Sequence, residues 1–91
     1  MESEQDKYDA LFYQLIVVFQ TAALQQMGRM MNPSSEKVEL NLEQARFSID
    51  ILDMLRTKTI GNLNEKEEKF LDDVVSGLQL TLIAEENKKN Q

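Results

Sequence analysis

The residue types that carry out most protein chemistry are missing from this 91-residue sequence. It has no Cys and no His. These two side chains supply the usual nucleophiles, general bases and transition-metal ligands. Only carboxylate oxygens remain as ligands for a hard cation.

The acidic and hydroxyl side chains do not form a recognisable catalytic or metal-binding pattern either. Asp50 and Asp53 lie three residues apart, and Glu65–Glu68 supplies one Glu-x-x-Glu pair. Helical di-metal sites instead use Glu-x-x-His pairs on two helices. Ser34–Lys37 places Ser beside Lys, but adjacency in sequence is not a catalytic geometry. We interpret these residues as surface charges and turn formers, and predict no enzyme activity, cofactor or metal.

The distribution of charge argues against several classes of partner. The net charge is −6, and ten basic residues are scattered among sixteen acidic ones. Nucleic acids and anionic membranes attract clustered Lys and Arg, so neither is expected to bind. The acidic start, MESEQDKYDA, is unlike the basic start of a signal peptide, and we expect a cytoplasmic location.

Hydrophobic periodicity predicts a long first helix over residues 8–31. No charged residue occurs from Ala10 to Gly28, and apolar residues nearly encircle the helix axis. Such a helix has to be buried on several sides. A membrane span needs about 20 apolar residues, whereas this stretch contains four Gln. We therefore do not expect it to cross a bilayer, and peripheral contact with lipid is the alternative.

Capping signals predict a second helix over residues 42–60, after a connection at 32–40. Asn41 is the expected N-cap, with Gln44 as its capping-box partner. Gly61 is the expected left-handed C-terminal cap. The helix has two apolar faces. One comprises Leu42, Ala45, Ile49 and Leu52, and the other Phe47, Ile51 and Met54.

A third helix is predicted over residues 65–84. Asn64 is its expected N-cap and Glu67 completes a second capping box. Its apolar residues form one stripe, as an outer helix requires: Phe70, Leu71, Val74, Val75, Leu78 and Leu82.

Together these segments predict an all-α fold, with a long apolar first helix and a helix-turn-helix pair packed as a bundle in a homo-oligomer. Residues 8–84 form one domain, after a flexible acidic lead-in at 1–7 and before a disordered tail at 85–91.

Self-association is expected because the first two segments carry more apolar surface than a three-helix monomer can cover. The simplest oligomer is a symmetric dimer. The competing interpretation is a compact monomer whose third helix and linker cover the remainder. The expected interface consists of Leu11, Phe12, Leu15, Val18, Phe19, Ala22 and Ala23.

The strings NLEQAR, IDILDML and KTIGNL, within Asn41 to Leu80, resemble a small bacterial family known as domain of unknown function 1844. The upstream run FYQLIVVFQTAALQQMG, followed by Asn32-Pro33, is similar to that family's first helix and turn. The resemblance implies a short helical bacterial protein and brings no catalytic residue with it. The function we expect is a non-catalytic interaction or adaptor protein that binds itself and, as an adaptor, a further protein. A peripheral membrane- or lipid-associated factor is the alternative.

Overall fold

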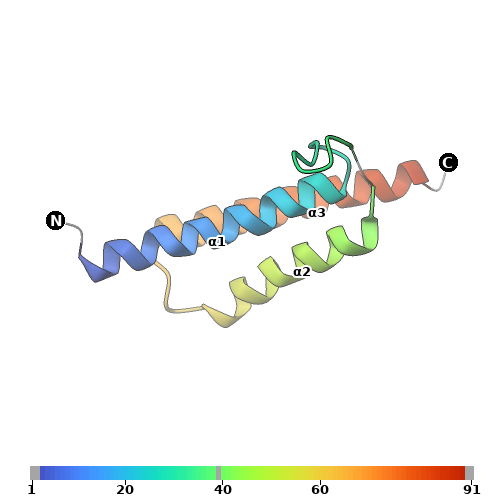
Figure 1. Cartoon of the computed structure of the whole chain (residues 1–91). Helices are drawn as coiled ribbons and strands as arrows, with labels where there is room; N and C mark the ends of the chain where they lie inside the picture. Colours follow the sequence, from blue (N-terminus) through green and yellow to red (C-terminus); the bar gives the residue numbers. More distant parts are fainter. Residues whose placement is uncertain (1–2, 39, 90–91) are drawn as a thin grey trace.

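The computed structural model describes residues 3–38 and 40–89, and within them it contains three helices and no strand. The helices are α1 (Glu4–Gln26), α2 (Leu42–Lys58) and α3 (Glu65–Lys89). In Figure 1, α1 and α3 run in the same direction. Helix α2 runs in the opposite direction, from the side where α1 ends to the side where α3 begins. The molecule is elongated, with extents of 50 × 28 × 16 Å. The predicted all-α class is confirmed.

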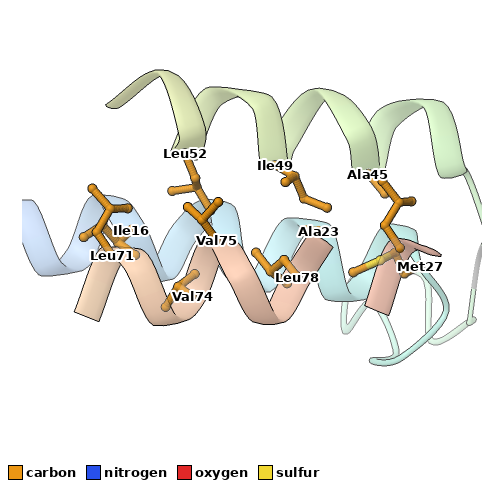
Figure 2. Packing of buried hydrophobic residues seen from close by; sticks show 11 residues of the cluster. Ile16, Ala23, Met27, Ala45, Ile49, Leu52, Leu71, Val74, Val75 and Leu78 are labelled. Carbon is orange, nitrogen blue, oxygen red and sulfur yellow. The ribbon is translucent and has the colours of Figure 1, made fainter. Parts of the chain in front are cut away.

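Each helix contributes one line of apolar side chains, and the three lines pack together along the long axis of the molecule (Figure 2). The stripe predicted for α3 and the first predicted face of α2 supply most of this core. The buried core residues are Ile16, Ala23, Met27, Ala45, Ile49, Leu52, Leu71, Val74, Val75, Leu78 and Leu82. The contact between α1 and α2 is the most extensive of the three helix pairs.

Helix α1 begins four residues before the predicted start, inside the segment expected to be flexible. The Ser3 hydroxyl accepts a hydrogen bond from the Asp6 N–H (3.1 Å), and the Asp6 carboxylate accepts one from the Ser3 N–H (3.4 Å). This reciprocal pair satisfies two backbone donors of the first turn and makes residues 4–7 helical. Residues 1 and 2 of the predicted lead-in lie outside the described residues.

The same helix ends at Gln26, five residues before the predicted end. Gly28 has a φ of +75°. The Arg29 N–H donates to the Leu24 carbonyl (2.8 Å), and the Gly28 N–H donates to the Gln25 carbonyl (3.1 Å). This Schellman arrangement reverses the chain, because the left-handed conformation that it requires suits glycine.

Asn41 is the N-cap of α2, and its side chain accepts a hydrogen bond from the Gln44 N–H (3.1 Å). The reciprocal half predicted for Gln44 does not form, because the Asn41 N–H donates to the Gln26 carbonyl instead (2.7 Å). The predicted role of Gly61 also needs correction. The C-cap is Thr59, and Gly61 (φ +86°) lies in the following turn, which the Asn62 N–H closes onto the Thr59 carbonyl.

At the start of α3 the complete capping box is present. The Asn64 side chain accepts from the Glu67 N–H (2.8 Å), and the buried Glu67 carboxylate accepts from the Asn64 N–H (3.0 Å). The other end of α3 differs from the prediction, since residues 85–89 are helical and not disordered. Glu85 and Glu86 pair with Arg29 and Arg46, which ties this end to the rest of the bundle. Residues 90 and 91 lie outside the described residues.

Candidate interaction surface

Exposed apolar side chains form a regular line along α1, which we call the α1 seam. It comprises Tyr8, Leu11, Leu15, Val18 and the half-buried Ala22. Steps of three and four residues alternate along it, which is the spacing of a coiled-coil contact line. Leu11 is 54% exposed and Val18 is 57% exposed. The seam is therefore built like a helix-packing surface, but none of the helices within residues 3–38 and 40–89 covers it.

Two contacts show which way the α1 seam faces. The Tyr13 ring packs against Phe70, with ring centroids 5.2 Å apart, and this marks the side of α1 that faces α3. The Gln26 side chain accepts a hydrogen bond from the Ser48 hydroxyl (2.8 Å), which marks the side that faces α2. Leu15 precedes Gln26 by eleven residues, about three helical turns, and so lies on the same side. The seam thus borders α2 and points away from α3.

A second exposed line, which we call the α2 line, consists of Phe47, Ile51 and Met54. Phe47 is 62% exposed, Met54 is exposed and Ile51 is half-buried. Ser48 marks the side of α2 that faces α1, and Ile51 lies about one turn beyond it. The α1 seam and the α2 line therefore flank the same side of the bundle. We call that side the α1–α2 face.

The predicted interface residues divide into three groups. Those exposed on the seam are Leu11, Leu15 and Val18. Phe12 and Phe19 are half-buried against the core, and Ala22 is half-buried on the seam. Ala23 is fully buried within the chain's own core, so its assignment to an interface was wrong. Tyr8 was missed, although the alternation of three and four residues extends back to it from Leu11.

Charged side chains gather on the other side of α2, where it packs against α3. Arg56 pairs with Asp53 on its own helix and lies 3.8 Å from Asp72 of α3. Arg46 pairs with Glu86 across the same helix pair. Exposed ion pairs of this kind contribute little to stability, about 0–1 kcal/mol each. Their main consequence is a strong contrast between a polar α2–α3 side and an apolar α1–α2 face.

A hollow of about 350 Å³ lies beside the turn between α2 and α3. Arg56 and Asp72 line it together with Ile60 and Leu71. The guanidinium group is already engaged by acidic side chains, and the lining offers no Cys or His. Within residues 3–38 and 40–89, no three acidic side chains gather closely enough to hold a metal ion. The hollow therefore offers no obvious chemistry.

None of the helices in the described part of the chain has a stretch that is both long and apolar enough to cross a membrane. Comparisons with curated proteins and with solved structures found no match. A family model described as "domain of unknown function (DUF1844)" matches residues 9–84. That range contains all of α2 and most of α1 and α3. The chain therefore belongs to the family described as domain of unknown function (DUF1844).

Proposed function

We propose that this chain is a non-catalytic interaction protein that works as a homo-oligomer, most simply a symmetric dimer, in which the α1 seams of two copies pack together. One observation supports the proposal above all. The seam places apolar side chains at heptad spacing on the exposed side of a helix that has no charged residue from Ala10 to its end.

Exposure of the seam is costly relative to the net stability of so small a domain. Leaving a large apolar side chain in water forfeits about 1.5–3 kcal/mol relative to burial. Net stabilities of folded domains are only about 5–15 kcal/mol. Several exposed side chains on one line therefore represent a large fraction of the total. Burial against a second copy recovers this free energy, and the small Ala22 side chain leaves room for close approach.

A lipid surface could also cover an apolar seam, but the surrounding charges favour protein. Helices that lie in a membrane interface carry Lys and Arg on their polar face. The first turns of α1 contain Glu4, Asp6 and Asp9 with Lys7 as their single basic residue. The net charge of −6 would further repel an anionic bilayer.

Two neighbouring valines provide a matched test. Val18→Glu places a carboxylate on the seam. Val17→Glu places the same group one turn after Tyr13, on the side of α1 that faces α3. Both positions are exposed, at 57% and 41%, so neither change introduces a fully buried charge. Circular dichroism should show that both variants keep the helical content of the wild type.

Size-exclusion chromatography with light scattering would then measure the mass of each protein. We expect Val18→Glu to be monomeric and Val17→Glu to associate like the wild type. Equal association of both variants would contradict a role for the seam. Loss of association in Val17→Glu alone would place the contact on the other side of α1.

A further inference from the structure

The α1 seam alone is small for a stable dimer. From the exposures of its side chains, it offers on the order of 400 Å² per chain, whereas a standard interface buries about 800 Å² per partner. Adding the α2 line raises the available apolar surface to on the order of 700 Å², since a Phe side chain alone can bury about 150–250 Å². A stable pair therefore needs a surface wider than one helix.

We infer that a second copy of this chain covers the whole α1–α2 face, with Phe47, Ile51 and Met54 forming the half of the interface contributed by α2. This inference rests on the proposed self-association and extends it. It assigns a partner surface to α2, the helix whose other apolar face is already in the core.

The two exposed lines are continuous with each other. Phe19 lies one turn after Leu15 on α1, and Leu55 lies one turn after Ile51 on α2. Phe19 and Leu55 are both half-buried and pack against the core cluster. Phe19 and Leu55 therefore add apolar surface between the seam and the α2 line, beside the side-chain hydrogen bond that joins α1 to α2, and a partner meets a single surface there.

The polar residues around this surface fit the rim of an interface. Gln44 and Lys58 are exposed near the two ends of the α2 line. Asp53 turns toward Arg56 and the α3 side. An apolar centre with polar residues at its edge is the usual anatomy of a protein interface.

A second copy fits this face because a two-fold axis brings identical patches together. A patch with charged groups at its centre would then meet like charges, which is unfavourable. The side chains of both lines are apolar, from Leu11 to Val18 along the α1 seam and at Phe47, Ile51 and Met54 along the α2 line. The exposed Asp50 lies one turn from both Phe47 and Met54, at the edge of the α2 line that points away from α1. Self-pairing therefore places this charge at the rim and leaves apolar side chains along the two lines.

The test uses Phe47→Glu, with Ile83→Glu as the matched control. Both residues are exposed and apolar, at 62% and 55%, but Ile83 is on α3, away from the α1–α2 face. Sedimentation equilibrium should show that Phe47→Glu raises the dimer dissociation constant at least about tenfold, equivalent to about 1.4 kcal/mol. Ile83→Glu should leave the constant within about twofold of wild type. Met54→Gln is a milder second variant, in case Phe47→Glu loses helical content, and should weaken the dimer in the same direction.

The outcomes separate this inference from the proposed function. A wild-type dimer that Val18→Glu dissociates, but that both Phe47→Glu and Met54→Gln leave intact, would overturn the role of α2 and leave the α1 seam as the contact. A wild-type protein that is monomeric and folded would overturn both proposals. Equal weakening by Phe47→Glu and Ile83→Glu would show a general charge effect and contradict the assigned face.

Discussion

Asn41 and Asn64 begin α2 and α3 with the same side-chain hydrogen bond, but their backbone N–H groups have different partners. The Asn64 N–H donates to the Glu67 carboxylate, which completes a local box. The Asn41 N–H donates to the Gln26 carbonyl and so links the start of α2 to the end of α1. The hydrogen bond to each Asn side chain was predictable, because its donor is the backbone N–H three residues later in the sequence. The Gln26 bond depends on the path of a fifteen-residue connection between two helices.

We predict that Asn64→Ala lowers the free energy of unfolding by about 0.5–2 kcal/mol, because it removes the acceptor of the Glu67 N–H. Asn64→Ser keeps a capping oxygen and should lose much less. Urea denaturation with m-values for all three proteins measures the difference. An unchanged midpoint for Asn64→Ala, with an unchanged m-value, would show that this cap contributes nothing.

We predict that Gly77→Ala stabilises the chain by about 0.5–1 kcal/mol. Gly77 lies inside α3 and is exposed, and a Cβ added there would have nothing within 4 Å. Glycine in a helix interior is less favourable than alanine by about that amount. Gly28→Ala is the contrasting variant, because its φ of +75° strains any side chain, and it should destabilise. A thermal midpoint of Gly77→Ala below that of wild type would indicate a close contact at this position.

At the scale of the helices, their existence and their starting caps were predictable, whereas several of their ends were not. The first helix stops at Gln26 because Gly28 reverses the chain and Met27 pairs with Leu40, a residue thirteen positions later. The third helix continues to Lys89 because Glu85 and Glu86 meet arginines far away in the sequence. Local spacing carries no information about such partners, and so both ends were misplaced.

The last turns of α3 should respond to pH through Glu85. The Lys88 ammonium and the Arg29 guanidinium hydrogen-bond to this carboxylate and hold its pKa below the ordinary value of 4.5. A lowered pKa means that the charged form stabilises the folded state. That contribution is fully present above pH 4.5 and is lost as the pH falls through the lower, folded-state pKa.

We therefore predict that residues 85–88 are helical at neutral pH and fray as the pH falls below 4.5. Glu85→Gln should fray the same residues already at pH 7, because the neutral amide pairs weakly with Lys88 and Arg29. Backbone chemical shifts across a pH titration measure both effects, with the core of α3 as an internal reference. Helical shifts that persist at acidic pH and in the variant would contradict this account of the helix end.

At the scale of the whole molecule, the bundle separates an apolar α1–α2 face from a charged α2–α3 side. The sequence predicted an excess of apolar surface on the first two helices. It could not show which side of the first helix enters the core, because apolar residues nearly encircle that helix. Ala23 and Val18 illustrate the ambiguity, since the former is fully buried and the latter is 57% exposed. Only the packing of α2 and α3 against α1 distinguishes them.

The most direct test of self-association through the α1 seam is the mass of the wild-type chain in detergent-free buffer. Light scattering and sedimentation at about 10–100 μM should give twice the 10.5 kDa of one chain. Dilution should shift this mass toward that of the monomer, and Val18→Glu should be monomeric throughout. A folded wild-type protein of 10.5 kDa at the highest concentration would contradict the account. Association that detergent alone relieves, into particles of no defined stoichiometry, would contradict it as well.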